Sequence, residues 1–514
     1  MSLLKSMATV SGFTAMSRVL GLVREILIAK YLGAGAVTDA FVAAFRFPNM
    51  FRRIFGEGAF NSAFVPLFGR ELEENGKDAA EEFASRTFTL MMLTLGIGTA
   101  IAIPLMPWIM KVFVHGYDEE KLRITVALGR IMFGYLLCMA VGAQLSGVLN
   151  TLKIFGVPAL APVLLNIFAI SGLIVAGFLY LESDLESIAA TLSWAIMASG
   201  IAQLLLLFFA CRHHGMRIRF VAPRWTERLK RLFILMGPGV LAAGIQQINI
   251  FIGTMIASKQ DGANSWLYFA DRIYQLPLGM IGIALGVVLL PDITRKLRAG
   301  DSKGANNSLN RGMEIGLLIT LPAAVAMLVI PQPIISTLFE RGEYTAEDSK
   351  QAAYALAAFA LGLPGYVLVR VLQPGYFARE DTLRPMKMGA VTVAINTGLS
   401  FLLFEYIGHI GIAIATTVAA WANVAMLLFG LRSDFQTDQQ VRSRLPRMLV
   451  ASMVMGGVVF GLAYLLKPWF AQGLWVKIPA LAVLVGAGMG IYGVLCLVTK
   501  AASLAELKAG FTRK

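Results

Sequence analysis

The stretch from Arg18 to Pro66 places charged side chains inside two long apolar runs, which are joined by the short turn Gly33-Ala34-Gly35. A charged side chain near the middle of a bilayer costs about 2.5–3.5 kcal/mol on insertion scales, so such residues face water or one another instead of lipid. The stretch is therefore predicted to line a polar cavity inside a membrane protein. Its charged residues are Arg18, Arg24, Glu25, Lys30, Asp39, Arg46, Arg52, Arg53 and Glu57. For Lys30, Arg52 and Arg53, a place at a helix end at the membrane surface is an equal alternative.

Four of these residues have the spacing of one helix face. Asp39, Arg46, Arg53 and Glu57 lie at offsets of 0, 7, 14 and 18 residues. At about 100° per residue in a straight helix, they fall within about 40° of one another. Pro48 is expected to kink this helix, so the stripe is approximate beyond it.

The preceding helix carries two more arginines. Arg18 and Glu25 are seven residues apart and share a face. Arg24 is about 120° away, so it joins them only if the helix loosens near Gly21 or its long side chain reaches round.

A second charged cluster, Asp271-Arg272, lies in the segment SWLYFADRIYQLP. Arg272 follows several aromatic residues, so it is either an interfacial residue beside an aromatic belt or a residue that faces the first cluster across a cavity. Arg370 and Glu314 are weaker candidates for the same cavity.

Arginine suits phosphate or pyrophosphate recognition, because it presents a planar fork of donors and stays charged when desolvated.

The sequence has no Walker A motif, no HExxH, no CxxC pair and no Ser/His/Asp set. Cys138, Cys211 and Cys496 lie far apart in apolar segments and are expected to be small core residues. We therefore expect a transporter for a substrate with an anionic head group, with no catalytic residue, metal or cofactor. Coupling to the membrane potential or to a monovalent ion stays open.

The composition is that of a membrane protein, with 57% hydrophobic residues, 15% charged residues and a mean hydropathy of +0.69. Arg18 and Arg24 interrupt the first apolar run, which is therefore expected to be a retained helix and not a signal peptide. Fourteen segments are long enough to span a bilayer, which predicts an all-α polytopic protein. They are 9–32, 37–68, 83–112, 123–150, 158–181, 187–211, 229–258, 263–293, 310–338, 350–376, 386–406, 409–431, 446–466 and 475–499.

The net charge of +14 is concentrated in alternate loops. With the N-terminus inside, the cytoplasmic loops carry most of the Lys and Arg, and the longest of them is the basic stretch 212–231. This imbalance predicts that both termini are cytoplasmic and that the number of spans is even. It also explains the charge by an inner surface facing anionic lipid, without nucleic acid.

The second and eighth spans share a pattern: a mid-helix proline, a second proline after an apolar residue, and an arginine four residues later. The residues are Pro48, Pro66 and Arg70, and Pro277, Pro291 and Arg295. Six spans separate the two copies, so they run in the same direction, as in transporters with parallel repeats. We predict two six-helix lobes, residues 1–220 and 221–435, followed by two further transmembrane helices and a cytoplasmic tail in 436–514.

The segment TDAFVAAFRFPNMFRRIFGEGAFNSAFVP closely resembles the MurJ (MviN) family of bacterial lipid II flippases. The resemblance covers the whole chain and includes Arg18, Arg24, the GAGAVTDAF turn, RRIFGEGAF and SWLYFADR. The family belongs to the multidrug/oligosaccharidyl-lipid/polysaccharide exporter superfamily. The resemblance implies two six-helix lobes around a central cationic cavity, plus two extra helices whose groove suits a polyprenyl tail.

The same resemblance implies roles for single residues. Arg18, Arg24 and Arg272 match arginines thought to contact the pyrophosphate-sugar head group, and Arg52 matches a further functional arginine. Asp39 and Glu57 match acidic positions tied to gating. Secondary candidates for the cavity are Arg53, Asp271 and Arg370.

The function implied is transfer of undecaprenyl-pyrophosphate-linked disaccharide-pentapeptide to the outer leaflet of the bacterial inner membrane by alternating access, for peptidoglycan synthesis. Expected partners are lipid II, membrane lipids and, as candidates, cell-wall synthesis proteins; we expect a monomer. The alternatives are a flippase for another polyprenyl-linked glycan, and a multidrug/cation antiporter, which would need a mainly acidic cavity. A membrane glycosyltransferase or polymerase would need a paired acid and base in a long outside loop, and the predicted outside loops are short.

Overall fold

The computed structural model describes the whole chain except residues 1–2, 53–58, 181–183, 223, 434 and 503–514. It also leaves undescribed the side chains of residues 3–8, 52, 59, 238, 241–242, 280–284 and 286–287. Over the described part, the chain forms eighteen helices and no strand. Contacts divide it into two compact units, Met1–Ser265 with Arg341–Thr345, and Trp266–Glu340 with Ala346–Lys514.

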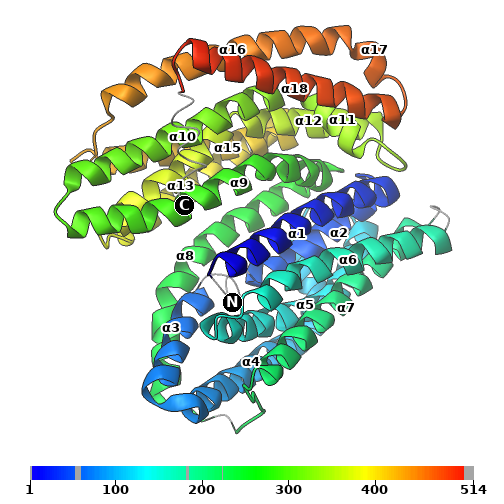
Figure 1. The fold of residues 1–514 in the computed structure, drawn as a ribbon. Helices are drawn as coiled ribbons and strands as arrows, with labels where there is room; N and C mark the ends of the chain where they lie inside the picture. Colours follow the sequence, from blue (N-terminus) through cyan, green and yellow to red (C-terminus); the bar gives the residue numbers. More distant parts are fainter. Residues whose placement is uncertain (1–2, 53–58, 181–183, 223, 434, 503–514) are drawn as a thin grey trace. The chain divides into compact units, whose positions relative to one another are not determined.

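The first unit is built around α5, which packs against α2, α4 and α7, while α1 packs against α6. Figure 1 shows α1, α6 and α7 side by side. The helices of this unit are α1 (Leu3–Leu32), α2 (Ala36–Arg52), α3 (Ala59–Glu74), α4 (Gly76–Phe113), α5 (Glu119–Thr151), α6 (Gly156–Leu179), α7 (Leu185–His213) and α8 (Glu227–Ala257).

The second unit is organised on α10, which packs against α12, α13 and α16. α16 and α18 lie side by side along one edge of this unit (Figure 1). Its helices are α9 (Ala263–Arg298), α10 (Ser302–Val329), α11 (Pro331–Phe339), α12 (Ala346–Ala360), α13 (Leu363–Phe377), α14 (Leu383–Ile407), α15 (His409–Gly430), α16 (Gln439–Leu465), α17 (Lys467–Phe470) and α18 (Leu474–Val498).

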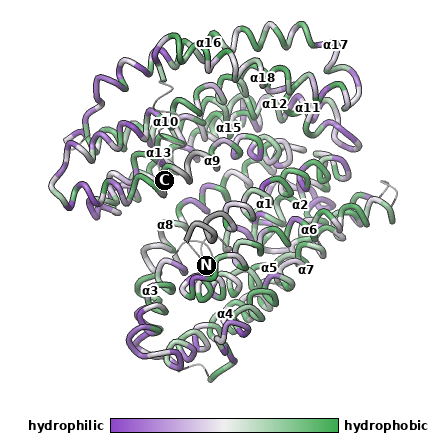
Figure 2. The backbone as a smooth tube through the Cα atoms, in the orientation of Figure 1, coloured by the Kyte–Doolittle hydropathy of each residue, from purple (hydrophilic) through white to green (hydrophobic). Residues whose placement is uncertain are grey.

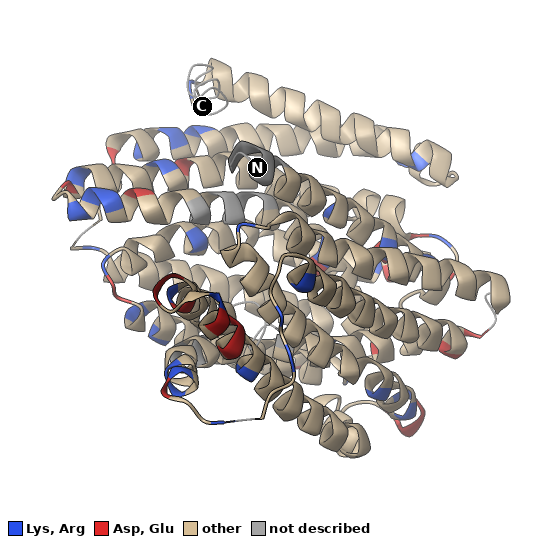
Figure 3. Ribbon diagram, turned by 60° about the horizontal axis from the view of Figure 1, so that its bottom comes forward, with Lys and Arg blue, Asp and Glu red and all other residues tan. Residues whose placement is uncertain are grey.

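Many of these helices can cross a membrane. Nine described helices are long and apolar enough, and ten candidate spans result if α12 and α13, bent by 40°, count as one. Figure 2 shows hydrophobic residues along much of the length of the helices and a concentration of hydrophilic residues where α3 meets α4. Figure 3 shows charged residues mainly toward helix ends. The protein is therefore a multi-pass membrane protein, as predicted.

The four remaining predicted spans, the first, second, seventh and eighth, fall in α1, α2 with α3, α8 and α9. Three of them, α1, α2 with α3, and α9, carry internal charges or prolines that the sequence analysis singled out, including Pro48 and Pro277. Charged residues and prolines lower the mean hydropathy of a helix. They do not prevent the helix from spanning the membrane when its polar face is buried in protein. The count of fourteen stays a prediction.

Two close backbone approaches fix the turn between α1 and α2 in the first unit. Gly33 has φ +65°, and a Cβ there would lie 2.5 Å from the carbonyl oxygen of Glu343. Gly342 has φ +57°, and a Cβ there would lie 2.2 Å from the carbonyl oxygen of Lys30. The Glu343 N–H donates to that Lys30 oxygen at 3.0 Å. Only glycine fits both positions, so the predicted turn is confirmed and the segment Arg341–Thr345 packs on it.

The basic connection between α7 and α8 is fastened to α4 by a regular set of hydrogen bonds. The backbone N–H groups of Arg217, Arg219 and Val221 donate to side-chain oxygens of Glu81, Ser85 and Thr89 at 3.0, 3.1 and 3.0 Å. Four helical residues rise about 6.0 Å and two extended residues about 6.6 Å, so the two periods nearly match. The segment 216–222 is therefore an ordered part of the first unit.

Candidate functional site

Asp39 lies in the first turn of α2 and is fully buried, with a side chain 0% exposed. Its Oδ2 accepts from the Lys121 ammonium at 2.6 Å and from the Gly262 N–H at 2.9 Å. Its Oδ1 accepts from the Ser265 N–H at 2.8 Å and from the Ser265 hydroxyl at 2.7 Å. Both carboxylate oxygens are thus satisfied twice, which is what a buried charge requires. The backbone donors lie at the start of α9, so Asp39 caps that helix from a distant part of the chain.

Lys121 in α5 supplies the positive charge for this carboxylate. It is 2% exposed, and it also bonds Asp261 at 3.0 Å, with its ammonium 4.4 Å from the centre of the Tyr117 ring. The sequence analysis placed Asp39 on one helix face with Arg46, but its cation is this lysine of another helix. Lys121 itself lies in the first turn of α5, two residues before the predicted fourth span. Asp118 does cap α5 by accepting from the Lys121 N–H at 2.8 Å, so a helix start could have been predicted here, but not which carboxylate Lys121 reaches.

Arg46 belongs to a neighbouring hydrogen-bonded set. Its Nη1 donates to Thr254 Oγ1 and to Asn264 Oδ1, both at 3.1 Å. Asn264 Nδ2 donates to the Tyr117 hydroxyl at 3.0 Å, and that hydroxyl donates to the Asp39 carbonyl oxygen at 3.1 Å. Burial, together with the nearby Asp39 charge, raises the pKa of Tyr117 well above its usual value, so the hydroxyl keeps its proton. Asp39 and Arg46 share a helix but bind different partners.

The turn between α4 and α5 also contacts the end of α8. The Gly116 N–H donates to Ser258 Oγ at 2.9 Å. A Cβ at Gly116 would lie 2.6 Å from both the N and the Cα of Lys259, so the two backbones touch at a position that only glycine allows. The Asp39 network therefore ties together the start of α2, the α4–α5 turn and the connection from α8 to α9. A network of this kind can hold one arrangement of these segments and release it when a partner is lost.

Arg24 is held by side chains of two helices. α1 is continuous from Leu3 to Leu32, so no loosening near Gly21 occurs. The Arg24 guanidinium donates from Nη2 to Glu25 Oε1 at 2.5 Å and from Nη1 to Asn166 Oδ1 of α6 at 3.1 Å. Its side chain is 12% exposed. Arg18 is half-buried on the same helix. A largely buried guanidinium ordered in this way is suited to bind an anion.

In the second unit, Arg272 is half-buried on α9, with its guanidinium carbon 4.5 Å from the centre of the Tyr268 ring. The preceding Asp271 accepts a hydrogen bond from Gln275. Arg370 is exposed on α13.

Glu314, one of the weaker cavity candidates, has a different environment from the one predicted. It forms ion pairs with Arg311 of its own helix and with Arg444 of α16. Arg311 also pairs with Asp438, which caps α16. Glu314 therefore fastens α16 to α10.

Three predicted site residues cannot be placed. Arg53 and Glu57 lie outside the described residues, and of Arg52 only the backbone, at the end of α2, is described. In the part of the chain that the structure covers, no group of three or more His, Cys, Asp or Glu residues is arranged to hold a metal ion.

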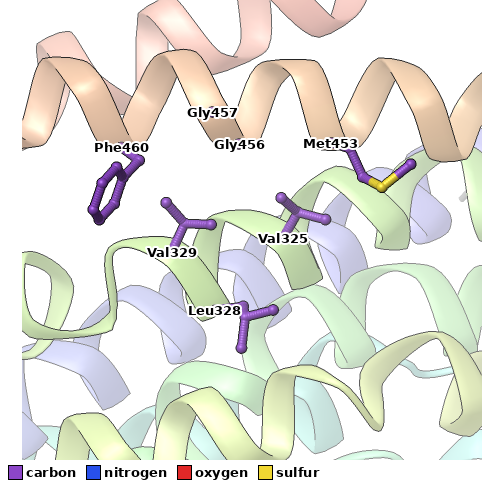
Figure 4. A pocket seen from close by; sticks show the side chains of 7 residues that line it. All are labelled: Val325, Leu328, Val329, Met453, Gly456, Gly457 and Phe460. Carbon is purple, nitrogen blue, oxygen red and sulfur yellow. The ribbon is translucent and has the colours of Figure 1, made fainter.

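An apolar groove of about 480 Å³ lies between α10 and α16 in the second unit. Figure 4 shows side chains from both helices around it. A Cβ at Gly456 would lie 2.5 Å from Val325 Cγ1, so α16 approaches α10 closely there, whereas Gly457 has open space around it. The lining residues of the groove are Val325, Leu328, Val329, Met453, Gly456, Gly457 and Phe460. A groove with this lining is complementary to a hydrocarbon chain.

Comparison with known proteins agrees with these features. The family model described as "Lipid II flippase MurJ" matches residues 28–480. A "Probable lipid II flippase MurJ" of Rhizobium tropici is 42% identical over 521 residues, covering 100% of this chain and 97% of the relative. A "Lipid II flippase MurJ" of Burkholderia cenocepacia is 35% identical, covering 89% and 90%.

Solved structures give the same result. "Lipid II flippase MurJ, inward closed conformation" superposes with a TM-score of 0.79 at 25% identity, covering 95% of this chain and 98% of that one. An inward-facing multidrug resistance MATE transporter of the MOP superfamily superposes with a TM-score of 0.69 at 15% identity, covering 81% and 94%, which shows a shared fold. The chain therefore belongs to the MurJ family of lipid II flippases.

Proposed function

We propose that this protein moves lipid II, the polyprenyl-pyrophosphate-linked disaccharide-pentapeptide, from the inner to the outer leaflet of the bacterial cytoplasmic membrane for peptidoglycan synthesis. Family membership supports this, because relatives over almost the full length are named for that substrate. The observation in the structure that carries it is the ordered, largely buried guanidinium of Arg24 inside an apolar helical bundle. The family also points to a transporter, and we propose no catalytic step.

The pyrophosphate-sugar head group would bind to arginines. Arg18 and Arg24 of α1 and Arg272 of α9 are the candidates with described side chains, and Arg52 joins them by its match to the family pattern. A guanidinium offers two parallel N–H donors to a phosphate, which a lysine ammonium does not. Arg53, Asp271 and Arg370 are secondary candidates.

The polyprenyl tail would lie in the groove between α10 and α16. That groove is lined only by apolar residues and glycines, and α16 is one of the two helices that follow the predicted lobes. A prenyl chain has no polar group to satisfy there, so burial of apolar surface would stabilise it.

Asp39 would act on the balance between inward- and outward-open states. The same role is proposed for Glu57, because it matches an acidic position of the family pattern. The structure supports this role for Asp39 because its carboxylate is fully used by Lys121, Gly262 and Ser265. An interaction made in only one state shifts the equilibrium by the free energy it contributes there. We propose that transport needs no ATP and draws on the membrane potential or a monovalent ion.

The proposed architecture comprises fourteen spans in two parallel six-helix lobes (1–220 and 221–435) around a central cationic cavity, with residues 436–514 holding two further helices and a tail. Both termini would be cytoplasmic, and the protein would act as a monomer. The charge distribution of the loops supports the topology, because the loops predicted to be inside carry most of the Lys and Arg.

The test is depletion of the protein in its host with leaflet-resolved measurement of lipid II. We expect lipid II to accumulate in the inner leaflet and to return to the outer leaflet when the parent protein is supplied. The alanine variants should not restore lipid II to the outer leaflet, although they are present at normal protein levels; these are Arg18→Ala, Arg24→Ala and Arg272→Ala. A lysine in place of any of these arginines should restore it poorly. Arg123→Ala is the matched control, because Arg123 forms an exposed pair with Glu186.

Two outcomes would contradict the proposal. Unchanged distribution of lipid II on depletion, with another polyprenyl-linked glycan accumulating, would identify the rival flippase. Full function of all three alanine variants would show that the arginines do not bind the head group.

A further inference from the structure

Asn166 in α6 presents a single, fixed acceptor to Arg24. Its side chain is 4% exposed. The Nδ2 atom donates to the carbonyl oxygen of Ser17 at 2.9 Å, and to the Pro162 carbonyl oxygen and Ser17 Oγ, both at 3.3 Å. If the amide were turned over, its oxygen would face two carbonyl oxygens and its nitrogen would face the Arg24 Nη1 donor. The Oδ1 atom must therefore point at Arg24 Nη1, 3.1 Å away.

Glu25 holds the other terminal nitrogen of the same guanidinium. Its Oε1 accepts from Arg24 Nη2 at 2.5 Å, and its residue is 3% exposed. Two acceptors from two helices, one for each terminal nitrogen, define the plane of the guanidinium. An arginine side chain otherwise has many rotamers, and ordering them on binding lowers affinity.

The surroundings of Asn166 are built for this contact. Gly21 of α1 lies opposite the amide, where a Cβ would come within 3.9 Å of both Oδ1 and Nδ2. A Cβ at this position would make only an ordinary van der Waals contact, so the amide packs close to the backbone of α1 without being crowded. α1 and α6 pack against each other along their lengths, so the amide is carried on a rigid pair of helices.

We infer that Asn166 is a positioning residue, which orders the Arg24 guanidinium for the anionic head group before the substrate arrives. This inference rests on the proposed function, because it assigns the anion to Arg24. Asn166 acts through Arg24, so its loss should matter only when Arg24 is present.

The experiment is a double-mutant cycle on the full-length chain in detergent, with the Kd for purified lipid II as the measurement. The proteins are the parent, Arg24→Ala, Asn166→Leu and the double variant. Leucine has the same number and branching of side-chain heavy atoms as asparagine, so it removes both hydrogen-bonding atoms with little change of shape. We expect Asn166→Leu to weaken binding about tenfold, as for loss of a hydrogen bond to a charged group, and to have no effect in the Arg24→Ala background.

Gln144→Leu is the matched control, because Gln144 is a buried amide that donates to the Ala84 carbonyl oxygen at 2.8 Å. It should leave the Kd at the parental value. Asn166→Gln is a second variant in case leucine prevents folding. It keeps the amide but moves it by one methylene, and should give a smaller loss that again depends on Arg24.

An equal loss in both Arg24 backgrounds would show a merely structural role and overturn the inference, as would an unchanged Kd for Asn166→Leu. Parental affinity of the Arg24→Ala protein would instead contradict the proposed head-group site. The two failures are therefore distinguishable.

Discussion

Replacing Lys121 by methionine should destabilise the first unit strongly, because Asp39 would be left as a buried carboxyl group without its cation. Methionine fills most of the volume of the lysine stem and removes only the ammonium. Breaking a buried pair by removing one partner typically costs about 3–5 kcal/mol. Asp39 would retain its bonds from Gly262 and Ser265, so we expect the lower end, about 3 kcal/mol.

The measurement is thermal unfolding of the purified protein in detergent. At about 2–4 °C per kcal/mol for a large unit, Lys121→Met should lower the unfolding midpoint by about 6–12 °C. Asp39→Asn removes the charge that needs compensation. The double variant Asp39→Asn/Lys121→Met should therefore lose less stability than the sum of the two single variants.

The control is Arg123→Met, two residues further along α5, where the ion pair with Glu186 is exposed. An exposed pair contributes little, so this variant should unfold close to the parent. A Lys121→Met protein that unfolds within about 2 °C of the parent would refute the reasoning, because about 3 kcal/mol cannot give so small a shift. Additive losses in the double variant would refute the pairing itself.

Three further predictions concern other parts of the chain. Gly342→Ala should destabilise the protein and expose the segment Arg341–Thr345 to limited proteolysis, because the new Cβ would clash with the Lys30 carbonyl oxygen. Gly76→Ala is the control, because Gly76 also has a positive φ, +81°, but has open space around it. This control should lower the free energy of unfolding by only about 1 kcal/mol. Glu314→Gln should lower the thermal midpoint by several degrees, because the ion pairs of this buried carboxylate with two partly buried arginines weaken. An unchanged midpoint would show that these pairs do not fasten α16. A single cysteine at position 220, in a protein lacking the three native cysteines, should resist an impermeant reagent applied outside; labelling there would overturn the topology.

Much of the architecture follows from local properties of the sequence. Hydropathy and length mark the spans, because a bilayer imposes a minimum apolar length on any helix that crosses it. The turn between α1 and α2 was predicted correctly, since glycines separate two apolar runs. The arginines of α1 were singled out because charge inside an apolar helix is costly and needs a reason. Each of these inferences uses residues close together in the chain.

The partners of the charged residues were decided by tertiary structure. Asp39 was expected beside arginines seven or more residues along its own helix, but its cation is Lys121, 82 residues away. Arg24 is held by Asn166, 142 residues away, and a lone asparagine in an apolar segment gave no signal of that contact.

The physical reason is that helical periodicity tells which residues share a face, but not which helix packs against that face. In the case of Asp39, periodicity placed Arg46 nearby. The fold instead brings Lys121 and the N–H groups at the start of α9 within hydrogen-bonding distance, and these donors satisfy the carboxylate. The sequence by itself determined that this chain is a membrane protein of helices with an arginine-bearing interior. Only the packing of distant helices decided which acid, amide and lysine hold those charges, because a buried charge takes whatever donors or acceptors the fold places within hydrogen-bonding distance.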